Sequence, residues 1–74
     1  MTKFPAVKSQ KLVKALQKMG FFGYHRVGSH VQFKHLDGRR TTVPVHSGKD
    51  IPRGTLRAVL KQINISPEEF RDVL

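Results

Sequence analysis

Apolar residues recur with a helical period towards both ends of the chain. Near the N-terminus they lie three or four positions apart, which predicts an amphipathic helix with the apolar positions Leu12, Val13, Leu16 and Met19. Ser9 is expected to cap the start of this helix, and Gly20 is expected to end it. A second helix, opened by Pro52, is predicted from the same spacing at Leu56, Val59, Leu60 and Ile63.

The stretch between these helices has the composition of β-strands. Three strands are predicted, over residues 21–27, 30–35 and 40–45, although the first of them alternates poorly. In the second strand, Val31 and Phe33 alternate with a polar set expected on the opposite, open face of the sheet: His30, Gln32 and Lys34.

Glycine marks the turns between these strands. Gly28-Ser29 joins the first two strands, and Asp37-Gly38 favours a two-residue type I′ turn with positive φ at both central positions. Pro44 has no N–H to donate to a strand ladder, so the third strand is expected at a sheet edge. The strand that begins at His30 is therefore expected in the centre of the sheet.

The order of the elements defines the fold class. Ser66-Pro67-Glu68-Glu69 has the pattern of a capping box, which predicts a short terminal helix through Val73. The chain is thus predicted to be α+β, with the order α-β-β-β-α followed by a short C-terminal helix. Two helices are expected to cover one face of a three-stranded antiparallel sheet, as in double-stranded-RNA-binding domains. We expect a single domain over residues 1–74.

Charge points to the kind of partner. Fourteen Lys and Arg residues against five Asp and Glu give a formal net charge of +9, and no acidic residue precedes Asp37. A small domain with this excess favours a polyanionic partner such as RNA.

Composition also excludes several classes of protein. The chain has no Cys, which removes disulfides, thiolate nucleophiles and Cys-based zinc sites. The four His residues lack the spacing of a metal site, so we expect neither a metal nor a cofactor. No apolar run is long enough to span a membrane and no signal sequence is evident, so a cytoplasmic protein is expected.

His30 is the candidate catalytic residue, because it follows a turn and is expected on the open face of the sheet, in a chain with a large excess of basic residues. An imidazole has an unperturbed pKa near 6.5 and can exchange a proton at neutral pH. Cleavage of RNA needs activation of a 2′-OH, stabilisation of phosphate charge and protonation of the leaving oxygen. For the last step, His46 and Lys34 are the candidate second acids. His25 and His35 are expected to be surface or sheet-flanking residues, and a solvent-facing His30 without function remains the alternative.

Basic side chains line one face of each long predicted helix. A helix face with only positive charges lacks the i, i+4 ion pairs that usually stabilise the exposed face of a helix. The unpaired positive charges favour contact with phosphates. The candidate RNA-binding residues are Lys11, Lys14, Lys18, Lys34, Arg53 and Arg57.

A purely duplex-binding module is the competing interpretation. Double-stranded-RNA-binding domains usually reach a second minor groove with a long loop between their first two strands. Here that loop is little more than Gly28-Ser29, and helix two begins without a dense lysine cluster. A non-catalytic RNA-binding module is kept as the alternative function.

Several short motifs together resemble one family. The chain contains Gly28-Ser29-His30, Asp37-Gly38-Arg39, Val43-Pro44 with His46, Gly54-Thr55-Leu56, and the stretch from Ile65 to Phe70. Their order and spacing are similar to those of the HicA (YcfA-like) toxins. The resemblance implies the toxin of a type II toxin–antitoxin system, an endoribonuclease that cleaves mRNA without metal. It implies that His30 is catalytic, that Gly28 and Ser29 present it, and that a HicB-type antitoxin covers the site in a hetero-oligomer.

Overall fold

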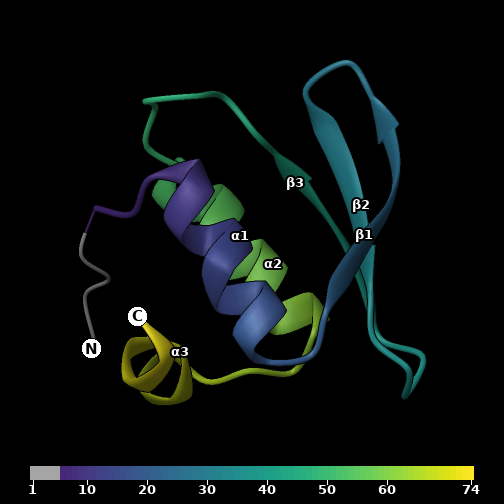
Figure 1. Ribbon diagram of the computed structural model, residues 1–74. Helices are drawn as coiled ribbons and strands as arrows, with labels where there is room; N and C mark the ends of the chain where they lie inside the picture. Colours follow the sequence, from purple (N-terminus) through teal and green to yellow (C-terminus); the bar gives the residue numbers. More distant parts are fainter. Residues whose placement is uncertain (1–5) are drawn as a thin grey trace.

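The computed structural model describes residues 6–74, which form a three-stranded sheet and three helices (Figure 1). In chain order the elements are α1 (Ser9–Lys18), β1 (Phe22–Val27), β2 (His30–Lys34), β3 (Arg40–Pro44), α2 (Arg53–Gln62) and α3 (Pro67–Val73). This order and the antiparallel pairing confirm the predicted α+β class.

The core lies between one face of the sheet and the helices. In Figure 1, α1 and α2 lie on the same side of the sheet. Phe33 and Val43 are buried on that face of the sheet, against residues that the predicted helical patterns supply: Leu12, Leu16, Leu56, Val59, Leu60 and Ile63. Because β-strand side chains alternate, the opposite face is left without a covering element among residues 6–74.

The sheet has the order β1-β2-β3, so the strand beginning with His30 is central and β3 lies at an edge. Both placements were predicted, the second from Pro44. His30 is paired with Pro44 on one side and with Val27 on the other. The register of β1 shifts between Gly23 and His25, which is a β-bulge. The bulge explains the poor alternation of β1, because the extra residue interrupts the period of two.

The two hairpin turns differ from each other. Gly28 has φ of 59° and no positive φ occurs at Ser29, which fits a type II′ turn. The predicted type I′ turn at Asp37-Gly38 is wrong: the positive φ there belongs to Gly38 alone. His35 N–H donates to Arg39 O (2.9 Å), and Gly38 N–H donates to His35 O (3.0 Å). These bonds close a three-residue loop, in which one glycine in the left-handed region is enough.

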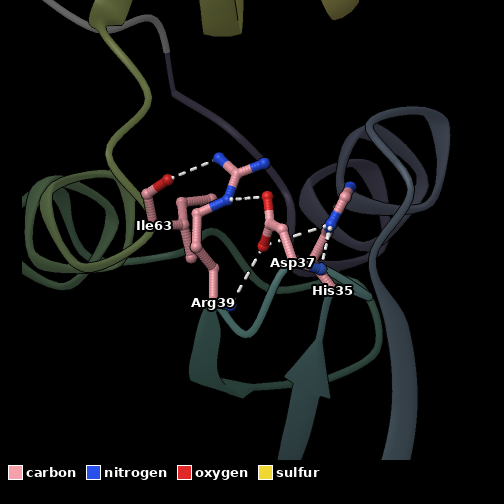
Figure 2. A network of polar contacts seen from close by, with 4 residues as sticks. All are labelled: His35, Asp37, Arg39 and Ile63. Atoms are coloured by element: carbon pink, nitrogen blue, oxygen red, sulfur yellow. Dashed lines mark hydrogen bonds and ion pairs between the residues drawn. The ribbon is translucent and has the colours of Figure 1, made fainter.

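Arg39 anchors this hairpin to the helical layer (Figure 2). Its Nη1 donates to the carbonyl of Ile63 (2.7 Å), just beyond the end of α2, and its Nε donates to Asp37 Oδ2 (2.8 Å). The backbone N–H of Arg39 also donates to Asp37 Oδ1 (3.0 Å). This N–H, helped by the guanidinium, holds the pKa of the Asp37 carboxyl below its usual value. The carboxylate therefore stays ionised, and keeps accepting its two bonds from Arg39, at lower pH than an ordinary aspartate would allow.

Ser9 does not cap α1 as predicted. The N-cap residue is Lys8, and Ser9 is buried as the first helical residue. The Ser9 hydroxyl instead donates to His46 O (2.7 Å) and accepts from His46 N–H (3.2 Å). The prediction failed because a serine at a helix start is also a good partner for another segment of backbone, and tertiary structure decides between the two.

The C-terminal helix belongs to the same core. Its predicted capping box is present, with Glu69 N–H donating to Ser66 Oγ (3.1 Å) and Ser66 N–H donating to Glu69 Oε1 (3.2 Å). Phe70 is fully buried in the main cluster. The Lys18 ammonium donates to the carbonyl of Val73 (3.3 Å), which ties the end of α1 to the end of α3.

Candidate functional site

His30 is the first residue of the central strand and is exposed to solvent. The turn before it is fixed on both sides. The Arg26 side chain donates through Nε to Gly28 O (2.8 Å), and Val45 N–H donates to Ser29 O (2.7 Å). Gly28 and Ser29 therefore hold the backbone from which the imidazole projects, in a turn attached to the neighbouring edge strand.

The face of the sheet that carries His30 contains no carboxylate. Gln32 and Lys34 follow His30 at the spacing of two that places them on the same face, as predicted. None of the residues in β1, β2 and β3 is acidic. An exposed imidazole on this surface can exchange protons with a ligand, while nearby cations attract a polyanion.

His46, a candidate second acid, lies two residues beyond Pro44, the strand partner of His30. Its backbone leaves the sheet and is bonded to Ser9 at the start of α1. The imidazoles of His30 and His46, both within the described part of the chain, are not hydrogen-bonded to each other. The β1–β2 turn, the β3–α2 segment and the start of α1 lie at the same end of the molecule (Figure 1).

Replacing Ser9 with alanine is expected to loosen the His46 segment. The substitution removes both bonds to the His46 backbone from a position that is only 1% exposed. Unpaired buried polar groups cost about 1–3 kcal/mol, so we expect the free energy of unfolding to fall by about that amount. Urea unfolding measures it, and Gln17→Ala, at an exposed position further along α1, is the control. An unchanged midpoint for Ser9→Ala would contradict this role.

The basic residues of α1 are exposed and border a groove. It has a volume of about 540 Å³ and is lined by Ala6, Lys8, Gln10, Lys11 and Lys14. Lys8 was not among the predicted residues; it also forms an exposed ion pair with Asp50 (3.5 Å). Lys18 lies at the far end of the helix and is bonded to α3. Arg53 and Arg57 are exposed on α2.

Lys34 contacts two aromatic residues that were not predicted as site residues. Its Nζ lies 4.7 Å from the centre of the Tyr24 ring and 5.7 Å from that of Phe22. Both rings are therefore on the open face: Phe22 is paired with Lys34, and Tyr24 follows two residues later, where the register of β1 shifts. The feature of the sequence that indicates these residues is the poor alternation of the first strand, which includes large apolar residues at positions that prove to be exposed.

The remaining histidines, possible metal ligands and possible membrane-spanning helices were considered among the described residues. Residues 6–74 contain no group of three His, Asp or Glu side chains that could hold a metal ion. His25 is exposed on the open face, opposite Gln32, and His35 packs edge-on against Phe21 with ring centres 5.0 Å apart. Within the same residues, none of the helices is both long and apolar enough to cross a membrane.

Comparison with known proteins assigns the chain to a family. A search of curated protein sequences found none that matches it. The family model of the HicA toxins of bacterial toxin–antitoxin systems, however, matches residues 9–65. The matched segment begins with α1 and extends past α2, so it includes the whole sheet and the turn that presents His30. With most of its length covered by that match, the chain belongs to the HicA toxin family.

Proposed function

We propose that this protein is the toxin of a type II toxin–antitoxin system and acts as an endoribonuclease on mRNA. The observation that carries the proposal is the position of His30. It is exposed at the start of the central strand, on a sheet face without carboxylates, inside the segment that matches the family.

In the proposed reaction His30 acts as general base or acid at the scissile phosphodiester. As a base it accepts the proton of the ribose 2′-OH, and the 2′-oxygen attacks phosphorus while the bond to the 5′-oxygen breaks. A second group gives a proton to that leaving oxygen; Lys34 and His46 are the candidates. Lys34 lies on the same open face as His30, four residues further along β2, and is assigned to the phosphate charge. The reaction uses side chains alone, without a metal ion.

Binding of RNA is assigned to the basic side chains around this end of the molecule. Lys11 and Lys14 line the groove on α1, and Arg53 and Arg57 are exposed on α2. Their phosphate contacts position the strand and make binding depend on salt. The proposed set also includes Lys18, at the other end of α1, and Lys34, on the open face of the sheet.

Membership of a toxin–antitoxin family implies an antitoxin partner. We propose a HicB-type antitoxin that binds in a hetero-oligomer and covers His30. We also propose that the protein acts in the cytoplasm, where mRNA is available, as one domain over residues 1–74.

Incubating the purified protein with RNA in the presence of EDTA tests this function. We expect cleavage that persists with the chelator, together with growth arrest and loss of mRNA when the protein is expressed in bacteria. Adding the antitoxin is expected to stop both. Salt-dependent RNA binding without cleavage would favour the alternative, a non-catalytic RNA-binding module in which His30 only stacks on or hydrogen-bonds to RNA.

A further inference from the structure

The open face of the sheet exposes aromatic rings beside a polar hollow. Phe22 is 40% exposed and Tyr24 is 42% exposed, so both leave a large part of their surface in contact with solvent. Lys34 is the cation that lies over both rings. Exposed aromatic rings next to a cation, on a sheet without carboxylates, form a surface suited to flat, electron-rich and anionic ligands.

The hollow adjoins the Tyr24 ring and has a volume of about 250 Å³. It is lined by Tyr24, Gln32, Arg40, Thr41, Thr42 and Gln62. The lining thus supplies a phenol ring, amide and hydroxyl groups and one guanidinium, and no carboxylate.

Two hydrogen bonds fix the orientation of these polar groups. The Tyr24 hydroxyl donates to Gln32 Oε1 (2.8 Å), so the Gln32 amide nitrogen remains a donor for a ligand. The Thr41 hydroxyl donates to Gln62 Oε1 (2.8 Å), which joins the edge strand to α2. These polar groups are therefore arranged before a ligand arrives, which lowers the entropic cost of binding. The Lys34 ammonium lies over the Tyr24 ring and has to move aside where a base stacks on that side of the ring.

We propose that this hollow binds one nucleobase of single-stranded RNA, stacked on Tyr24, with Gln32 and Arg40 donating hydrogen bonds to the base edge. The inference deepens the proposed function and rests on it. Proteins recognise unpaired RNA bases by stacking them on aromatic rings and bonding their exposed edges, a combination that this hollow offers. The Lys34 ammonium complements the phosphates that flank the base. A base stacked in an A-form duplex cannot present its face to Tyr24, so the site selects single strands.

The spacing of residues along β2 relates the position of this base to the phosphodiester bond that is cleaved. Gln32 lies two residues along β2 from His30 on the same face, which is roughly 7 Å at the usual rise of a strand. A base held beside Gln32 therefore places a neighbouring phosphodiester within reach of His30. The hollow is assigned to positioning the substrate and to choosing which bond is cleaved.

Binding of a short single-stranded RNA that carries a fluorescent adenine analogue tests the site. The host is the His30→Ala protein, so that cleavage does not consume the probe. Tyr24→Ala is expected to weaken binding about tenfold and to abolish quenching of the analogue, within the usual range for a lost base–aromatic stack. Tyr24→Phe keeps the ring and is expected to retain the quenching and most of the affinity. Affinity for duplex RNA of the same sequence should not change in either variant.

The outcomes separate this site from the proposed nuclease. If Tyr24→Ala leaves single-strand affinity and quenching intact, the nucleobase site is wrong, even where the protein with His30 intact cleaves RNA. If Tyr24→Ala weakens only the complex with the antitoxin, the face is a protein-docking surface and the proposal is overturned. Tyr24-dependent quenching in a protein that never cleaves RNA would support the base site and reject the nuclease.

Discussion

Replacing His30 with alanine should lower the rate of RNA cleavage by about 10²–10⁴-fold, the usual contribution of a general acid or base. The affinity for RNA should change little, because the cations that attract phosphate lie elsewhere. The side chain is exposed at the start of β2, so its removal leaves no cavity in the core and the variant should unfold at the same temperature as the wild type. Single-turnover cleavage and RNA binding, measured on the same preparation, separate these quantities.

His25 supplies a matched control for this experiment. It is an exposed imidazole on the same face of the sheet, opposite Gln32 in the neighbouring strand. His25→Ala should cleave RNA at close to the rate of the wild-type protein. Equal losses in the two variants would mean that the general basicity of the face matters rather than one proton-transfer group. Full activity in His30→Ala would refute the assignment of His30 as the catalytic residue.

Replacing Phe70 with alanine should destabilise the protein by about 3–5 kcal/mol, the usual cost of deleting a buried phenylalanine ring. Phe70 is fully buried in the main hydrophobic cluster, although it lies in α3, beyond the segment that the family model matches. A chain of this length has roughly 4–11 kcal/mol of stability in total, so a large fraction of the variant should be unfolded at growth temperature. Chemical unfolding followed by circular dichroism measures the loss.

Leu36→Ala is the control for this substitution. Leu36 is 90% exposed in the β2–β3 loop, so its truncation should shift the free energy of unfolding by less than about 0.5 kcal/mol. A Phe70→Ala protein as stable as the Leu36→Ala protein would show that α3 is not an integral part of the core. RNA cleavage by Phe70→Ala should follow the fraction of folded protein, since the ring is buried in the core whereas His30 is exposed at the start of β2.

Local patterns were sufficient for most of the fold. The helical spacing at Leu56, Val59 and Leu60 predicted a buried helix face, because a period near 3.6 brings these side chains to one side. Pro44 predicted an edge strand from its missing N–H, and the structure confirms it. Gly20 ends α1 with φ of 94°, as expected where a left-handed residue closes a helix.

Structural features that depend on contacts between residues far apart in the sequence were predicted less well. Asp37-Gly38 was expected to form a two-residue turn, but the Arg39 side chain bonds to both Asp37 and Ile63, and a three-residue loop satisfies those bonds. Tyr24 was not predicted as a site residue because the poor alternation of the first strand did not assign its side chains to one face or the other, and the β-bulge is what interrupts that alternation.

The sequence by itself determined the order of the elements, the buried faces, the acid-free basic surface and the exposure of His30, because each follows from local periodicity, turn chemistry or charge. Tertiary structure alone decided how Ser9 is used, where the His46 segment lies and which side chains contact Tyr24 on the open face. These depend on contacts such as Ser9 with His46 and Tyr24 with Gln32 and Lys34. Hydrogen-bonding and aromatic side chains have several possible partners, and only the packing of the sheet against the helices selects among them.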